Sequence, residues 1–252
     1  SHDRFDAGTI PWSDEQAAAE RLRAAARRFC EVADNEDWSI IWCAGAATTT
    51  TSALDARREL VALEGLLERI RSAVPGGRGS FFLTSSAGGV YAGSQYPPFD
   101  NETPPAPISA YGELKVSQEA LTCTYLQDLC PVAIGRISNL YGPGQNLAKL
   151  QGLISLLANA AVTRQPVNIF VPLDTIRDYI FSTIGQLIRS MSQIARRRVP
   201  VALGTHSSAA AQASDLRVLP THVPPLVTPL PTGMKSVYLD ILERVQHQTL
   251  TA

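Results

Sequence analysis

The run Ser80–Gly89, SFFLTSSAGG, gives the clearest indication of the fold. Its first half is short and apolar, with two phenylalanines, as expected for a buried strand. Its second half contains only small residues, so the strand passes directly into a loop. Such a transition is typical of a parallel sheet, in which ligands bind outside the carboxyl ends of the strands.

Two other segments repeat this pattern. Trp38–Cys43 (WSIIWC) is apolar and passes into Ala44–Ala47 (AGAA), and Val132–Ile137 (VAIGRI) is a third predicted strand. Helical spacing of apolar residues predicts helices between them, over Asp55–Ser72 and Ser109–Leu129. Parallel neighbours need a crossover of this length, so the sequence predicts an α/β fold with a parallel sheet and helices on both faces.

The flanking segments are predicted from weaker patterns. Ser13–Ala33 is rich in Ala, Arg, Leu and Glu and predicts a helix that Ser13 caps. The expected elements after the third strand are a helix at Leu150–Val162, a strand at Val167–Val171, a helix at Thr183–Ala195, a strand at Val199–Leu203 and a helix at Gly233–Val245. The loops at 44–51, 85–95 and 138–146 are then the candidates for function.

The composition narrows the function classes. The 252 residues carry 22 Lys and Arg against 23 Asp and Glu, a net charge of −1, so a nucleic acid or membrane partner is not expected. The longest apolar stretch, Gly152–Val162, is shorter than the about 20 residues that span a bilayer. The four cysteines form no CxxC pattern, and we expect neither a disulfide nor a metal site. Without a secretory leader at Ser1, the expected location is cytoplasmic.

The sharpest local motif is Tyr111-Gly-Glu-Leu-Lys115 at the start of a predicted helix. Side chains four residues apart share a helix face, so the phenol and the ammonium can reach one site. A fixed cation favours the phenolate and would bring the pKa of Tyr111 toward neutrality, which suits a base that acts on a hydroxyl. The alternative is an ordinary amphipathic face, because the motif is short. The catalytic use also needs an upstream hydroxyl, which Ser86 or Ser85 would supply.

A resemblance emerges from four motifs in order. The runs SSAGGVYAG from Ser85, NETPPAPISAYGELK from Asn101, GRISNLYGPGQN from Gly135 and DTIRDYIF from Asp174 resemble the extended short-chain dehydrogenase/reductase superfamily. More narrowly, they are similar to its NAD-dependent sugar-nucleotide epimerase/dehydratase family. The resemblance implies a Rossmann-like doubly wound parallel sheet over residues 1–147, followed at 148–252 by a small, mainly substrate-binding α/β portion with some segments that return to the sheet.

The resemblance also implies roles for individual residues. Tyr111 matches the family's base and Lys115 the lysine that assists it, and both are also implied to contact the cofactor, Lys115 at the nicotinamide ribose. Ser86, with Ser85 as the alternative, matches the hydroxyl that assists proton transfer. The remaining implied positions are Cys43, Ala44, Gly45, Ile137 and Ser138 for the cofactor, and Ser86, Asn139 and Arg177 for the substrate. No metal is implied.

The implied reaction is epimerisation of a nucleotide sugar through a transient keto intermediate, with NAD as cofactor and NADP left open. Family members that are dehydratases place an acidic pair where this sequence has Ala87-Gly88, which disfavours dehydration. Two alternatives stay open: an NAD(P)-dependent reductase or dehydrogenase of a non-nucleotide carbonyl, and a non-catalytic binding protein that keeps the fold. By resemblance alone, a homodimer through the helices at Asp55–Ser72 and Ser109–Leu129 is expected.

The sequence departs from the family in two places. The family's first strand and its Gly-x-x-Gly-x-x-Gly loop, which cradles the cofactor pyrophosphate, are not found. Gly76–Gly79 is no substitute, because it lies between a predicted helix and a strand. After Phe181 the sequence moves directly to what resembles a later helix. We therefore expect that stretches at both places are missing from this sequence.

Overall fold

The chain forms two compact units in a computed structural model that describes residues 5–12, 14–100, 102–145, 152–169, 177, 179–181 and 202–203. The first unit comprises Ser1–Ser94, Pro104–Arg136 and Met191–Ala202. The second comprises Gln95–Thr103, Ile137–Ser190 and Leu203–Ala252. Each unit is considered by itself below.

A four-stranded sheet in the order β1-β2-β3-β6 forms the centre of the first unit. Its strands are β1 (Ile40–Trp42), β2 (Phe81–Ser86), β3 (Val132–Ile137) and β6 (Ala202–Leu203). β1 and β2 are parallel, with Ile40 opposite Phe81 and Trp42 opposite Leu83. The carboxyl ends of these two strands therefore lie at the same edge of the sheet, where the sequence places its small-residue loops.

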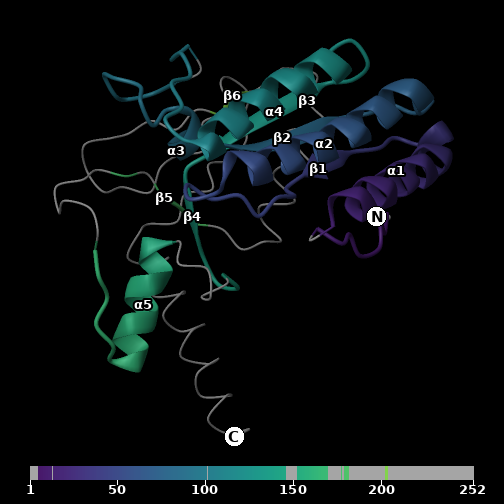
Figure 1. The fold of residues 1–252 in the computed structure, drawn as a ribbon. Helices are drawn as coiled ribbons and strands as arrows, with labels where there is room; N and C mark the ends of the chain where they lie inside the picture. The colour runs from purple at the N-terminus through teal and green to yellow at the C-terminus, as the bar shows by residue number, and fades with distance from the viewer. Residues whose placement is uncertain are drawn as a thin grey trace, which may run out of the picture. The chain divides into compact units, whose positions relative to one another are not determined.

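Three long helices, α1 (Glu15–Val32), α2 (Ala53–Ala73) and α4 (Ala110–Leu126), lie side by side along this sheet (Figure 1). Each begins at a side-chain cap, in which Asp14, Ser52 and Ser109 accept hydrogen bonds from backbone N–H groups of the first turn. The chain moves in the same direction across the sheet from β1 to β2 and from β2 to β3. Right-handed connections of this kind place α2 and α4 on the same face of the sheet. Short elements complete the unit: a 3-10 turn at Ala33–Asn35 and α3 (Ala87–Val90).

The core lies between these helices and the sheet. Phe81 and Leu83 of β2 are fully buried, as are Leu63 and Leu67 of α2. Leu126 at the end of α4 is also inaccessible and belongs to the same cluster. Because the apolar positions of both helices meet the sheet here, this burial fixes where α2 and α4 begin relative to the strand ends.

α3 and α4 approach each other closely through two glycines. A Cβ on Gly112 would overlap the backbone carbonyl oxygen of Gly89 and lie 2.8 Å from the Cβ of Pro107. A backbone oxygen cannot rotate away as a flexible side chain can. Glycine at position 112 therefore allows the first turn of α4 to lie against the turn that follows β2.

Replacement of Gly112 by Ala is expected to lower the free energy of unfolding by roughly 1–3 kcal/mol, the usual cost of overpacking. The overlap with Gly89 outweighs the better helix propensity of alanine, which is about 1 kcal/mol. Gly88→Ala is the matched control, because a Cβ there meets nothing within 4 Å. Denaturant unfolding of both variants measures the difference, and equal stabilities would contradict this account.

The second unit contains a two-stranded parallel sheet and a helix. β4 (Asn139–Tyr141) pairs with β5 (Tyr179–Phe181), with Asn139 opposite Tyr179 and Tyr141 opposite Phe181. The ring of Tyr141 makes edge contacts with those of Tyr179 and Phe181, at centroid distances of 6.1 and 5.4 Å. This aromatic group packs with Ile154 of α5 (Leu153–Thr163).

Most elements expected from the sequence are present with ends shifted by a few residues, and the strand at 132–137 has the expected bounds. Four expectations were wrong. Asp14, not Ser13, caps α1. Residues 167–169 form no strand, the loop at 85–95 contains the end of β2 and α3, and the loop at 138–146 contains β4. The helices expected at 183–195 and 233–245 lie outside the described residues.

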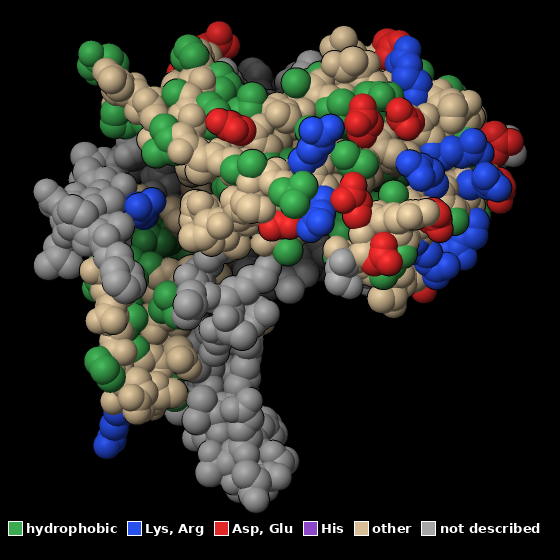
Figure 2. Space-filling view, viewed as in Figure 1, with side chains coloured by type: hydrophobic (Ala, Val, Ile, Leu, Met, Phe, Trp, Pro, Cys, Tyr) green, Lys and Arg blue, Asp and Glu red, His purple; other side chains and the backbone are tan. Residues whose placement is uncertain are grey.

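Charges of both signs are interspersed over the face of α1 and α2 that Figure 2 shows. Arg58 of α2, for example, pairs with Glu15 at the start of α1 and with Asp55 one turn before it. This mixture matches the net charge of −1 and provides no extended basic field. Within the described ranges, no helix has both the length and the apolar character to cross a membrane.

Candidate active site

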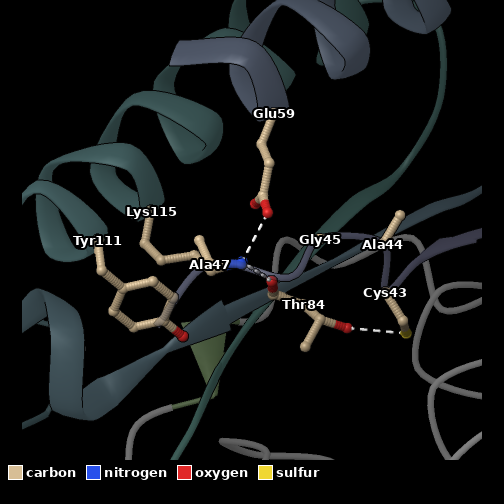
Figure 3. A pocket seen from close by; sticks show the side chains of 8 residues that line it. All are labelled: Cys43, Ala44, Gly45, Ala47, Glu59, Thr84, Tyr111 and Lys115. Atoms are coloured by element: carbon tan, nitrogen blue, oxygen red, sulfur yellow. Dashed lines mark hydrogen bonds between the residues drawn. The ribbon is translucent and has the colours of Figure 1, made fainter. Parts of the chain in front are cut away.

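A small pocket of about 100 Å³ opens at the carboxyl ends of β1 and β2 (Figure 3). Its residues come from the loop after β1, from β2, and from α2 and α4, in accord with the expected position of a ligand site in a parallel sheet. They are Cys43, Ala44, Gly45, Ala47, Glu59, Thr84, Tyr111 and Lys115. Five of the eight, Cys43, Ala44, Gly45, Tyr111 and Lys115, are residues that the sequence singled out.

Tyr111 and Lys115 occupy the first turns of α4 and both face the pocket. The ammonium of Lys115 lies 5.7 Å from the ring centroid of Tyr111. It donates hydrogen bonds to the Thr84 carbonyl at 3.3 Å and to Oε1 of Gln118 at 3.1 Å. The side chain is thus held at the pocket with its charge against the face of the phenol ring.

Ser86 provides the hydroxyl partner of Tyr111. The Ser86 oxygen accepts the Gly89 N–H as the N-cap of α3, at 3.2 Å, which leaves its proton to donate to the Tyr111 oxygen. Burial has the largest effect on Tyr111 and raises its pKa. The Ser86 hydrogen bond lowers this pKa and the charge of Glu59 raises it, so the pKa of Tyr111 lies above that of an ordinary phenol. The expectation that Lys115 brings this pKa toward neutrality was wrong for the chain alone, because burial dominates and the ammonium faces the ring.

Ser85 is committed elsewhere. Its hydroxyl donates to Oε1 of Glu119 at 2.5 Å, and Glu119 in turn forms a buried ion pair with Arg136 at 2.7 Å. Arg136 also donates to the Tyr91 hydroxyl at 2.5 Å and lies 5.1 Å from the ring centroid of that residue. Burial lowers the pKa of Arg136, but its hydrogen bonds and the charge of Glu119 outweigh that effect and raise the pKa above the ordinary value. The network joins β2, α4, β3 and Tyr91, the residue that follows α3.

The other candidates lie from the last residue of β3 onward. Ile137 is buried at the end of β3, and the Oγ of Ser138 is buried without a partner among the described residues. Asn139 opens β4, and Arg177 lies two residues before β5, the strand that pairs with β4. Both of these side chains are exposed within their unit.

More than half of the chain matches a known protein family. Residues 31–192 match the model of the family described as "NAD dependent epimerase/dehydratase family". The chain belongs to this family. The Rossmann-like α/β fold and the NAD cofactor of the family are those expected from the sequence, and the family resemblance is confirmed.

Two curated relatives match part of the chain. A dTDP-L-rhamnose 4-epimerase of Burkholderia thailandensis is 29% identical over 129 residues, 47% of this chain and 36% of the relative. A dTDP-4-dehydro-6-deoxyglucose reductase of Escherichia coli is 33% identical over 109 residues, 43% of this chain and 34% of the relative. The matches therefore span about a third of the length of these relatives.

Among solved structures, the fold resembles that of the UDP-glucose 4-epimerase of Thermus thermophilus in its complex with NAD. The TM-score is 0.64 at 20% identity, and the match covers 91% of this chain and 81% of the other. At this level of identity, the likeness shows the fold alone.

The side chains at the pocket suit one end of a dinucleotide. A phenol and an ammonium at the strand ends are groups that hydrogen-bond ribose hydroxyls, and about 100 Å³ does not enclose a whole dinucleotide. β1 lies at an edge of the described sheet. Residues 5–12 and 14–39 before it contain helix and irregular structure but no strand, so the strand, glycine loop and helix that would cradle a pyrophosphate are not found among them. The residues present thus fit the nicotinamide end of the cofactor.

Metal ligands and thiols are the other reactive groups in the described part of the chain. No group of three or more His, Cys, Asp or Glu residues there could hold a metal ion. Cys30, Cys43, Cys123 and Cys130 are free thiols. The sequence analysis missed one pocket residue that carries charge, Glu59, which lies on the otherwise apolar face of α2 between Ala56 and Leu63.

Proposed function

We propose that the protein catalyses the NAD-dependent epimerisation of a nucleotide sugar through a transient keto intermediate. The observation that carries the proposal is the hydrogen bond between Ser86 and Tyr111 beside the Lys115 ammonium, at the strand ends of a fold that this family uses. The role of each residue follows from its place in the pocket.

Tyr111 is the proton carrier. Its oxygen takes the proton from the sugar hydroxyl during oxidation and returns it when the keto group is reduced, so no proton is gained or lost overall. Ser86 donates to this oxygen and stabilises it when it is charged. Lys115 supplies a fixed positive charge to the same group. Bound NAD would supply the hydride acceptor and donor, and Cys43, Ala44 and Gly45 would contact it. The cofactor roles of Ile137 and Ser138 stay predictions from the family resemblance.

The substrate contacts are proposed on chemical grounds. Asn139 and Arg177 are exposed near the paired strands β4 and β5, and an amide and a guanidinium suit a diphosphate. The family's nucleotide-sugar chemistry supports that substrate class. A homodimer stays a prediction, which sedimentation of the full-length protein would measure.

The carboxylates near the pocket favour epimerisation over dehydration. Ala87 and Gly88 follow Ser86, so no acid directly follows the catalytic hydroxyl in the chain. The carboxylate that lines the pocket, Glu59, is engaged by backbone N–H groups. The acidic pair that family dehydratases place directly after the catalytic hydroxyl is therefore absent from this position of the sequence.

Incubation of the full-length protein with UDP- and dTDP-sugars tests the proposal. A product epimer by NMR, with no net change in NADH absorbance, is the expected result. No turnover of any nucleotide sugar, together with no bound NAD, would favour a non-catalytic binding protein.

A reductase is the second candidate, because the E. coli relative at 33% identity is a dTDP-4-dehydro-6-deoxyglucose reductase. The same Tyr111, Lys115 and Ser86 would serve it, since reduction is half of the epimerisation cycle. Stoichiometric consumption of NADH with a keto sugar, and no epimer, would favour this function.

The two neighbouring serines give a paired test. Ser86→Ala removes the hydrogen bond that lowers the pKa of Tyr111, so the acid limb of the pH–rate profile is expected to move to higher pH. Ser85→Ala removes only the contact to Glu119, and the limb is expected to stay in place. Profiles of kcat against pH for both variants measure this, and a shift in Ser85→Ala alone would reverse the assignment.

A further inference from the structure

Glu59 has a place in the pocket that the proposed reaction does not use. It lies in the second turn of α2, and its side chain points from the helix toward the loop after β1 (Figure 3). Its Oε1 accepts hydrogen bonds from the N–H groups of Ala46 at 2.5 Å and Ala47 at 2.7 Å. Its Oε2 is buried and has no hydrogen-bond partner in the described part of the structure.

The loop is shaped around this carboxylate. Gly45 has φ +130°, a conformation that side chains rarely adopt, and a Cβ there would lie 2.5 Å from Oε2 of Glu59. Two backbone donors that follow one another in the loop would otherwise be free to bind an anion. The protein's own carboxylate fills this position, so it both fixes the loop and places a negative charge in the pocket.

We propose that Glu59 is a positioning residue of this site, which fixes the Gly45–Ala47 loop and supplies the negative charge that faces Tyr111 and Lys115. The inference rests on the proposed function in that Tyr111 and Lys115 act in it. Glu59 itself takes no part in proton or hydride transfer.

The surroundings of Tyr111 show how this charge acts. Burial raises its pKa, the Ser86 hydrogen bond from the end of β2 lowers it, and Glu59 on α2 raises it. Lys115, on the same helix, contacts the ring face. Glu59 thus opposes the phenolate, and its removal should make Tyr111 easier to ionise.

Lys115 meets charges from three elements. Burial lowers its pKa, while Glu59 from α2, Cys43 from the loop after β1 and Glu119 from α4 raise it. The charge of Glu119 is compensated by the ion pair with Arg136. Glu59 forms no such ion pair among the described residues, so its negative charge is not compensated by a neighbouring cation side chain in the same way. This charge favours the charged form of Lys115.

Glu59→Gln separates charge from geometry, because the amide oxygen can still accept from Ala46 and Ala47. The ultraviolet phenolate titration of Tyr111 is obtained by subtracting that of the same protein with Tyr111→Phe. We expect its midpoint to move to lower pH in Glu59→Gln, because the opposing charge is lost. Glu64→Gln is the matched control: it removes one carboxylate from the same helix, where Glu64 meets Tyr125 at 3.4 Å rather than the pocket.

An unchanged Tyr111 midpoint in Glu59→Gln, or an equal shift in Glu64→Gln, would overturn the proposal. Glu59→Ala removes the acceptor as well, and hydrogen exchange of the Ala46 and Ala47 amides is expected to accelerate in it but not in Glu59→Gln. Equal exchange in both variants would remove the positioning role. These readouts need no turnover, so they stand apart from the sugar panel, whose failure would reject the proposed function instead.

Discussion

Replacement of Tyr111 by Phe is expected to lower kcat for the nucleotide sugar by roughly 100- to 10,000-fold, the usual contribution of a positioned acid or base. Phenylalanine keeps the ring but loses the oxygen that carries the proton. The hydrogen bond from Ser86 loses its acceptor at the same time. No other phenol lines the pocket among the described residues, so none can take over.

The fold should survive this change. The Tyr111 ring packs beside Gly89, where an added Cβ would come within 3.0 Å of it, and that packing is independent of the hydroxyl. Circular dichroism and the unfolding midpoint should therefore match the parent protein. Unchanged turnover in the well-folded variant would refute the role of Tyr111, and Tyr125→Phe, at the far end of the same helix, is the control that should keep full activity.

Replacement of Glu119 by Ala is expected to lower the free energy of unfolding by about 3–5 kcal/mol, the typical cost of removing one partner from a buried ion pair. The side chains of Arg136 and Glu119 are only 12% and 8% exposed. Without the carboxylate, the guanidinium keeps its charge in a site that water reaches poorly. Ser85 loses its acceptor as well.

Two controls define the source of this loss. The double variant Glu119→Leu with Arg136→Met replaces both charges by apolar groups and should recover most of the stability, because such replacements are often neutral. Asp128→Ala breaks the exposed pair with Arg71 and should leave the denaturant midpoint where it is. A midpoint for Glu119→Ala that equals the parent's would show that the network is not stabilising.

The strands and long helices were predictable because their signals are local. Each strand of the main sheet that the sequence predicts is a short apolar run, and the buried positions of α2 recur at helical spacing, as in Leu63, Leu66, Leu67 and Ile70. Capping was predictable in kind but not in place, since Ser13 and Asp14 are both good caps and only the backbone selects between them. β4 and β5 are three residues each, too short for periodicity to show.

The part of the site that lies on a single helix, α4, was predictable. The spacing of Tyr111 and Lys115 fixes a common face, whereas the charges that act on them come from distant segments. Glu59 is 52 positions before Tyr111 in the chain, and its one signal was a charge on the apolar face of a helix. Burial has the largest effect on the pKa of Tyr111, and burial depends on the whole packed unit rather than on the motif.

The contrast between Ser85 and Ser86 makes β2 sensitive to a shift of one residue. Ser85 is held by Glu119, whereas Ser86, one residue later at the end of the strand, meets Tyr111, and both partners belong to α4. Insertion or deletion of a single residue within β2 would exchange the two environments without changing which residues are present. An alignment with relatives therefore informs about these two serines only when it keeps each of them at the same position of the strand.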